Sequence, residues 1–235
     1  MTHEELIASL HQGLIVSCHA DEFEDEPQFS AFKYFVRSSI QGGAVGLRIE
    51  GPDRIRSVRS LTKIPIIGFV HGTYEDGSAL ITPTLDDVER VIEAGADVVA
   101  IDSTRRKRPG DTDGFLFFEQ ARKRFNIPLW ADIASFREGV RAAEMGADLI
   151  ATTLAGYTPN TSSDDYRTPD YPLIKELAAS LTHPVIAEGR IWSPADAVRC
   201  LSLGAHAIVV GSAITRPQII TQMFVSEIQQ SSRRP

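Results

Sequence analysis

The sequence predicts an α/β fold, a (β/α)8 TIM barrel formed by a single domain over residues 1–235. A glycine followed by alanine and a short apolar run recurs every ~50–60 residues, about two βα units of a ~250-residue barrel. Between these repeats lie further short apolar runs with proline near their start, and helical patterns separate all the runs. The glycines are Gly43, Gly95, Gly146 and Gly204, and the proline phrases start at Ile64, Ile127 and His183.

Both phrases predict strand boundaries for physical reasons. Glycine tolerates the left-handed backbone that ends many helices, so each Gly-Ala pair marks the end of a helix and the start of a buried strand. Proline has no N–H group to donate, so it belongs at the first residue of a strand. With the run at 13–17 added, eight strands are expected to start near residues 13, 44, 65, 97, 128, 148, 184 and 206.

The segments between these strands carry apolar residues at three- and four-residue spacing, which is typical of amphipathic helices. They are Phe29–Gln41, Asp53–Leu61, Leu85–Ala94, Gly114–Phe125, Phe136–Met145, Pro172–Leu181, Pro194–Leu203 and Arg216–Ile228. Helix start signals occur at Thr84, at Ser135 with Glu138 as a capping box, and at Ser193. Residues 1–12 are expected to form a helix that closes the bottom of the barrel, and residues 229–235 a disordered tail. An open doubly wound sheet would instead show a glycine-rich fingerprint after its first strand, where this chain has Ser-Cys-His-Ala.

Composition and charge exclude some classes of partner and location. A formal net charge of −7 argues against nucleic acid as a partner. No apolar run reaches the ~18 residues of a membrane span, and the polar start of the chain does not resemble a secretory signal. Cys18 and Cys200 both lie in apolar stretches, and free thiols indicate a reducing compartment. We therefore expect a cytoplasmic protein that acts on a small molecule.

In a barrel of this kind the chemistry lies where the strands end. The last two expected strands both stop at glycine, at Gly189 and at Gly211 followed by Ser212. Glycine lets N–H groups approach an anion, and a following helix N-terminus favours negative charge, so this pair predicts a phosphate site. Glu188 faces the same mouth. The basic run from Arg105 to Arg108 is read as a solvated loop.

These strand ends resemble the bacterial N-acetylmannosamine-6-phosphate 2-epimerase family, from Gly13 to about Phe224. The phrases that carry the resemblance are Gly-Leu-Ile-Val-Ser-Cys at 13–18, Gly-Gly-Ala-Val-Gly-Leu-Arg at 42–48, Ile-Pro-Ile-Ile-Gly at 64–68, Ile-Thr-Pro-Thr at 81–84, Ala-Asp-Ile-Ala at 131–134, Thr-Thr-Leu-Ala-Gly-Tyr-Thr at 152–158, Val-Ile-Ala-Glu-Gly-Arg at 185–190 and Val-Val-Gly-Ser-Ala-Ile-Thr-Arg-Pro at 209–217. The resemblance implies an isomerase that interconverts N-acetylmannosamine 6-phosphate and N-acetylglucosamine 6-phosphate in sialic acid and amino-sugar catabolism. It implies no cofactor and no metal.

The resemblance also assigns roles to positions of this chain. It implies that Glu188 is catalytic. It implies that Arg48 and Asp132 bind the sugar, and that the phosphate-binding residues are Gly189, Gly211, Ser212 and Arg216. We expect His19, Thr153 and Arg190, which also lie at strand ends, to be further substrate-binding residues.

Two positions depart from the family pattern. The family usually has glutamine where this chain has His19. The family also has a catalytic lysine followed by arginine in the third strand's phrase, where this chain has His71 and Gly72. The distance from His71 to the following Ile-Thr-Pro-Thr phrase is preserved, so histidine stands at the position of the lysine.

Epimerisation beside a carbonyl needs a base, a group that stabilises the enolate, and an acid on the opposite face. Histidine is a competent general base, because its reference pKa of ~6.5 leaves much of it neutral at pH 7. Strands three and seven lie roughly across the barrel from each other, so we expect His71 and Glu188 to form the acid/base pair. Arg48 and Asp132 would position the sugar, and Arg48 would replace the positive charge of the lost lysine.

Two alternatives remain open at the sequence level. His19, His71, Asp102 and Glu188 carry imidazole and carboxylate groups that suit a divalent metal, which would make the chain a metal-assisted epimerase or isomerase of another sugar phosphate. A non-catalytic phosphosugar-binding protein would keep the anion site without the lysine. The last helix packs either on its own barrel or on a partner, which leaves room for a homodimer.

Overall fold

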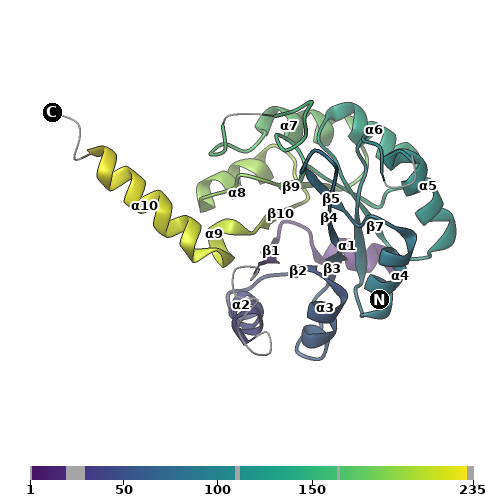
Figure 1. Ribbon diagram of the computed structural model, residues 1–235, viewed down its shortest axis with the longest axis horizontal. Helices are drawn as coiled ribbons and strands as arrows, with labels where there is room; N and C mark the ends of the chain where they lie inside the picture. Colours follow the sequence, from purple (N-terminus) through teal and green to yellow (C-terminus); the bar gives the residue numbers. More distant parts are fainter. Residues whose placement is uncertain (1, 20–29, 109–111, 163–164, 232–235) are drawn as a thin grey trace.

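The computed structural model describes residues 2–19, 30–108, 112–162 and 165–231, and it shows a closed barrel of parallel strands (Figure 1). Around the barrel the strand order is β1-β10-β9-β8-β7-β6-β3-β2. The strands are β1 (Leu14–Cys18), β2 (Gly46–Glu50), β3 (Ile66–Phe69), β6 (Val98–Asp102), β7 (Leu129–Asp132), β8 (Leu149–Ala151), β9 (Val185–Glu188) and β10 (Ala207–Val210). Each begins one or two residues after its expected start, so the predicted barrel is confirmed.

Helices alternate with these strands. They are α2 (Ser30–Gln41), α3 (Pro52–Arg59), α4 (Leu85–Glu93), α5 (Gly114–Arg124), α6 (Phe136–Glu144), α7 (Tyr171–Ser180) and α8 (Pro194–Ser202). The hydroxyls of Thr84 and Ser193 cap α4 and α8 in complete capping boxes. The capping box expected at Ser135 is wrong, because the Ser135 side chain makes no capping bond. Glu138 instead accepts the N–H of Ala134 at 2.9 Å.

The barrel strands are buried on both faces, and alternate residues face two different cores. Side chains such as Ile15, Ile67 and Trp130 form an interior cluster, while their strand neighbours pack against the surrounding helices. The helix α1 (His3–Ser9) contributes to the interior cluster through Leu6, as does Leu10 just after it. Residues 2–12 thus pack against the barrel as a short helix and a turn.

Two segments differ from what we expected. The segment between β3 and α4, for which no helix or strand was predicted, contains an antiparallel hairpin, β4 (His71–Thr73) and β5 (Ala79–Ile81). The expected last helix is present as α10 (Pro217–Ser231), and a separate short helix that was not predicted, α9 (Ser212–Thr215), precedes it. The helix α10 contains no buried residue and extends away from the barrel (Figure 1). It also runs past residue 229, where we expected the tail to begin, and residues 232–235 lie outside the described residues.

Within the described ranges, no helix combines the length and apolar character that a membrane crossing requires.

Candidate active site

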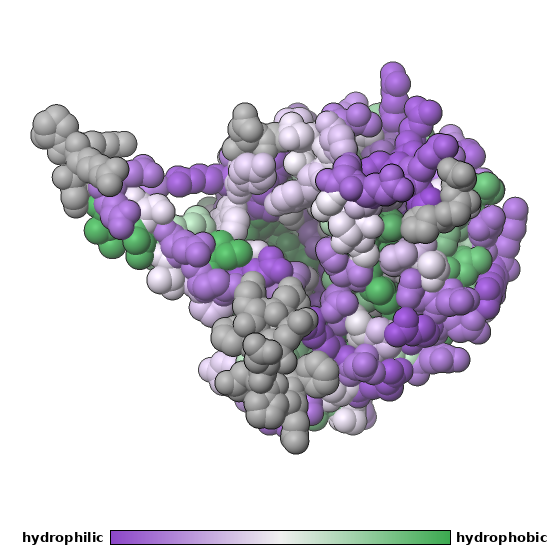
Figure 2. Space-filling model, viewed as in Figure 1, coloured by the Kyte–Doolittle hydropathy of each residue, from purple (hydrophilic) through white to green (hydrophobic). Residues whose placement is uncertain are grey.

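The carboxyl ends of the barrel strands surround an open cavity of about 830 Å³. In Figure 2 the face is hollowed near the ends of β9 and β10, and hydrophobic side chains are visible inside the hollow. Ten of the eleven residues predicted for the site line this cavity: His19, Arg48, His71, Thr153, Glu188, Gly189, Arg190, Gly211, Ser212 and Arg216. Residues that are far apart in the sequence therefore meet at one mouth, as the barrel topology requires.

The centre of the site is an arginine shared by two carboxylates. Arg48, in the middle of β2, donates to both oxygens of Asp132 from Nη1 at 3.0 Å and from Nη2 at 2.7 Å. Its Nη1 also donates to Oε2 of Glu188 at 2.9 Å. The Thr153 hydroxyl lies between the two carboxylates, 2.5 Å from Asp132 Oδ1 and 2.9 Å from Glu188 Oε2. Two carboxylates are thus held beside each other with one guanidinium between them.

Two aromatic side chains that sequence reasoning did not select hold this cluster in place. The guanidinium carbon of Arg48 lies 4.8 Å from the ring centroid of Phe69 and 5.7 Å from that of Trp130. The indole N–H of Trp130 also donates to Asp132 Oδ1 at 2.8 Å. The signal was in the sequence, because Trp130 precedes Asp132 by two residues and strand alternation places both on the same face.

Burial raises the pKa of Glu188 well above its ordinary value. Desolvation raises the pKa of Glu188 to about 7, and the neighbouring Asp132 carboxylate also raises it, while Arg48 and the Thr153 hydrogen bond act in the opposite direction. Burial alone would lower the pKa of Arg48, but the two carboxylates raise it above its ordinary value, so the guanidinium stays charged. The site therefore combines a fixed cation with a carboxyl group that can exist in either protonation state near pH 7.

Asp132 was expected to contact the sugar, but the structure places it outside the cavity lining. Its side chain is fully buried, and among the described residues it is absent from those that line the cavity. Its oxygens are occupied by Arg48, Trp130 and Thr153. Asp132 therefore acts on the site through Arg48, which it orients, and not by touching the cavity itself.

His71 enters the mouth from the hairpin. It is the first residue of β4, its side chain is exposed, and it lines the same cavity as Glu188. The strand that leads into the hairpin, β3, lies four places from β9 in either direction around the ring of eight, so the two residues approach from opposite sides. A Cβ on Gly72 would lie 2.5 Å from Pro83 Cγ, which leaves no room there for the arginine of the family pattern.

The expected phosphate residues gather at the other end of the cavity. Gly211 ends β10 and Ser212 begins α9. A Cβ on Gly211 would lie 2.8 Å from Nε2 of His19, so this close approach requires glycine. Nη2 of Arg216 lies 3.4 Å from Nδ1 of His19, whose Nε2 is 3.1 Å from Ser17 Oγ. A cationic side chain, an imidazole and backbone N–H groups thus converge where an anion can bind.

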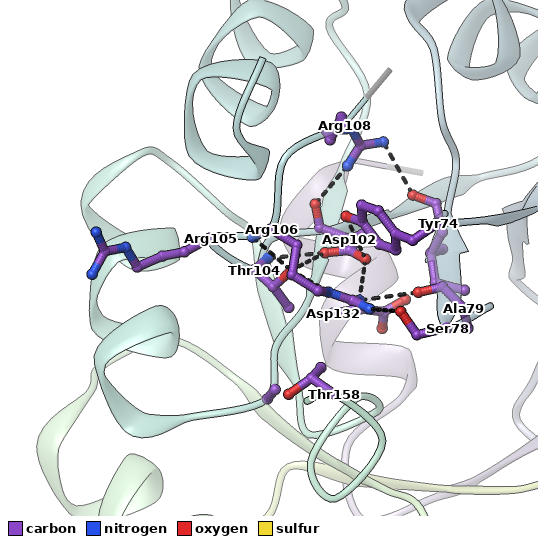
Figure 3. A network of polar contacts seen from close by, with 12 residues as sticks. Tyr74, Ser78, Ala79, Asp102, Thr104, Arg105, Arg106, Arg108, Asp132 and Thr158 are labelled. Atoms are coloured by element: carbon purple, nitrogen blue, oxygen red, sulfur yellow. Dashed lines mark hydrogen bonds and ion pairs between the residues drawn. The ribbon is translucent and has the colours of Figure 1, made fainter. Parts of the chain in front are cut away.

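The four residues considered for a metal do not form a ligand set, although His19, His71 and Glu188 line the same cavity. Among the described residues, no three His, Cys, Asp or Glu side chains are grouped so that they could hold a metal ion. The fully buried Asp102 is instead paired with Arg106 at 2.7 Å (Figure 3). The donor geometry therefore does not support the metal-assisted alternative.

Comparison with known proteins agrees with this geometry. A family model described as "Putative N-acetylmannosamine-6-phosphate epimerase" matches residues 33–230. Curated relatives named "Putative N-acetylmannosamine-6-phosphate 2-epimerase" include one from Caldanaerobacter subterraneus, 44% identical over 96% of this chain and 95% of the relative. Another, from Listeria monocytogenes, is 44% identical over 92% of both chains.

Solved structures extend the comparison. The N-acetylmannosamine-6-phosphate 2-epimerase from Clostridium perfringens superposes with a TM-score of 0.85 at 36% identity, covering 96% of this chain and 97% of the other. A thiamine phosphate pyrophosphorylase from Pyrococcus furiosus has a TM-score of 0.60 at 19% identity over 89% of both chains, which reflects the barrel fold alone. The chain belongs to the N-acetylmannosamine-6-phosphate 2-epimerase family.

Proposed function

We propose that the protein interconverts N-acetylmannosamine 6-phosphate and N-acetylglucosamine 6-phosphate in sialic acid and amino-sugar catabolism. The observation that carries this proposal is Glu188, a carboxyl group with a pKa near 7 that lines the cavity beside a fixed guanidinium. A group whose pKa lies near the working pH can remove a proton in one direction and return it in the other. Family membership supports the same reaction.

The reaction changes the configuration at C2, beside the C1 aldehyde of the open-chain sugar. A base removes the C2 proton, the electron pair of the C–H bond forms a C1=C2 double bond, and the π electrons of C1=O move onto the oxygen to give an enolate. Arg48 lines the cavity and remains charged, so it can stabilise the negative charge that develops on the oxygen. Collapse of the enolate with a proton delivered to the opposite face gives the epimer.

Two groups on opposite sides of C2 are needed, and His71 supplies the second. Imidazole can give or take a proton near neutral pH, and His71 lines the cavity from the side opposite Glu188. In one direction Glu188 is the base and His71 the acid, and in the other direction the roles are exchanged. The Thr153 hydroxyl lies within hydrogen-bond distance of both Glu188 and Asp132, so it fixes the carboxyl group relative to Arg48.

The other predicted residues bind the substrate. We assign the 6-phosphate to the end of the cavity formed by Gly189, Gly211, Ser212 and Arg216, with His19 packed against Gly211. Arg190 also lines the cavity and donates to the carbonyl of Asp165 at 3.0 Å, which holds its guanidinium at the rim. Anchoring the phosphate at one end places C2 between the two acid/base groups.

The test is proton NMR of N-acetylmannosamine 6-phosphate with the protein in D₂O. We expect deuterium at C2 and the appearance of the gluco epimer. In Glu188→Gln and in His71→Ala the epimer should be lost, and exchange at C2 should fall to the residual rate that the remaining group supports. Turnover close to wild type in His71→Ala would refute the acid/base pair. Tight binding of the sugar phosphate without any exchange at C2 in the wild-type protein would favour a non-catalytic binding protein instead.

We also propose a homodimer in which a second copy of the chain covers α10. This helix has no buried residue, and Phe224, Val225 and Ile228 are 68%, 45% and 62% exposed. Hydrophobic side chains are visible on the helix in Figure 2. Light scattering should give twice the mass of one chain, and Phe224→Glu with Ile228→Glu should reduce it to the mass of one chain.

We place the protein in the cytoplasm, since Cys18 and Cys200 are free thiols.

A further inference from the structure

The hairpin that carries His71 also provides two more residues to the cavity wall, Ala79 and Ile81 on β5. The two short strands pair so that His71 lies opposite Ile81 and Thr73 lies opposite Ala79. An isolated two-stranded hairpin is marginally stable in water. Its position over the mouth therefore depends on what attaches it to the barrel.

Arg106 is the residue that joins β5 to the barrel wall (Figure 3). Its Nη2 donates to the carbonyl of Ala79 at 3.0 Å and to Asp102 Oδ2 at 2.7 Å. Its Nη1 donates to Ser78 Oγ at 2.8 Å, and the guanidinium carbon lies 4.2 Å from the ring centroid of Tyr74. One planar side chain thus contacts the turn, the second strand and the buried carboxylate at the end of β6.

A second arginine holds the end of the hairpin that joins the barrel. Arg108 is 3% exposed and donates to the carbonyls of Ile81, Thr82 and Asp102. Burial lowers the pKa of Arg108 to about 10, so it is still charged at neutral pH. Thr82, at a φ of 52°, donates its hydroxyl to the carbonyl of Ala100 at 2.6 Å. The reading of the 105–108 run as a solvated loop is therefore wrong for Arg106 and Arg108.

These contacts attach β5 and the turn, while β4 follows β3 after the single residue Val70 and is joined to β5 by the pairing of the two strands. The backbone of His71 is thus fixed on one side by β3, and on the other side its position depends on how Arg106 holds the turn and the facing strand. A shift of about 1 Å in a catalytic group can lower the rate of a reaction by roughly 10². A loose hairpin would leave the phosphate end of the cavity intact and misplace only the acid/base group.

We propose that Arg106 is a positioning residue for catalysis, which acts through the β4–β5 hairpin to hold His71 at the distance from C2 that proton transfer requires. The proposal rests on the function proposed for His71 above. It adds a role for a residue that does not line the cavity and that joins two βα loops into one unit. Asp102 and Tyr74 contribute by fixing the plane of the Arg106 guanidinium.

The experiment compares Arg106→Met with Arg105→Met in the epimerisation assay. Arg105 is the matched control, because it lies next in sequence, carries the same charge, is exposed, and points away from the network (Figure 3). We expect Arg106→Met to lower kcat roughly 10- to 100-fold with little change in KM. Arg105→Met should leave both constants close to wild type. Arg106→Lys, which keeps the charge but lacks the planar fork, should lie between them.

A double-mutant cycle separates positioning from a general loss of structure. If Arg106 acts through His71, Arg106→Met should have little further effect on the residual C2 exchange in a His71→Ala background. In Arg106→Met alone, hydrogen exchange of the segment 70–82 should become faster while the melting temperature stays within a few degrees of wild type. Ser78→Ala removes a single bond to Arg106 and tests the same idea with less risk to folding.

Each result has a distinct meaning. Wild-type kcat in a folded Arg106→Met variant, or an equal loss of rate with and without His71, would overturn the positioning role while leaving the proposed function intact. Wild-type turnover in His71→Ala would instead overturn the acid/base pair, and the role of Arg106 with it. Loss of kcat in both single variants, with a double variant no worse than His71→Ala, supports both proposals.

Discussion

Replacing Glu188 by glutamine should make the protein more stable at alkaline pH while it abolishes turnover. Burial raises the pKa of Glu188 from 4.5 to about 7, and the side chain is only 13% exposed. Each pKa unit corresponds to about 1.4 kcal/mol. Holding Glu188 ionised in the folded protein above pH 7 therefore costs about 3 kcal/mol relative to the unfolded chain.

The direction of this pH dependence of stability follows from how many protons the folded and unfolded states bind at Glu188. Between pH 4.5 and 7 the folded protein binds more protons at Glu188 than the unfolded chain does, so the free energy of unfolding falls as the pH rises through this range. Glu188→Gln removes this dependence and leaves Arg48 paired with Asp132 alone. For a chain of this size, about 3 kcal/mol corresponds to roughly 6–12 °C in melting temperature. We expect a gain of that order at pH 8 and a much smaller one at pH 5.

The assay is thermal unfolding at pH 5 and pH 8, together with C2 exchange in D₂O. Glu50→Gln is the matched control, because Glu50 is the other carboxylate lining the cavity and it forms an ordinary ion pair with Arg54 at 2.7 Å. Removing that charge should bring no gain in stability at pH 8. A Glu188→Gln protein that is no more stable than wild type at pH 8, or that gains equally at both pH values, would refute the reasoning.

Three other perturbations have defined outcomes. Trp130→Phe removes the indole donor to Asp132, and we expect it to cost about 1–3 kcal/mol in urea unfolding and to lower kcat through a misplaced guanidinium. Gly211→Ala pushes a methyl group against His19, so the KM for the sugar phosphate should rise roughly tenfold in steady-state kinetics at an unchanged fold. Burial lowers the pKa of His206, so the unfolded chain binds more protons there and wild type should lose stability as the pH falls below ~6.5. His206→Gln should flatten that part of a series of melts from pH 7.5 to 5.5.

The strand ends could be predicted from the sequence because their signals are local. Glycine after a helix and proline at a strand entry act on the backbone of their own residues, so they mark boundaries wherever they occur. Once eight strands are placed in order, the barrel topology brings their last residues together. This is why Arg48, Glu188 and Gly211, which are widely separated in the chain, were all expected at one mouth and do line one cavity.

The contacts between those residues could not be predicted in the same way. Whether Asp132 would touch the sugar or pair with Arg48 depends on side chains 84 residues apart. The same holds for Arg106, whose bonds to Ser78 and Ala79 span 28 and 27 residues. A run of four basic residues is usually solvated, and only the folded hairpin beside it shows why two of the four are partly or fully buried.

The charge of the residue at position 71 affects the pKa of Glu188. A lysine on the hairpin would add a positive charge to the mouth, favour the ionised form of Glu188 and so lower its pKa. With histidine there, the nearest fixed cation is Arg48, and Asp132 already neutralises it through two hydrogen bonds. Desolvation, together with the neighbouring Asp132 carboxylate, therefore outweighs Arg48 and raises the pKa of Glu188 to about 7. Histidine in place of the family's lysine thus removes a positive charge on one side of the substrate. Glu188, on the other side, can then act as either acid or base.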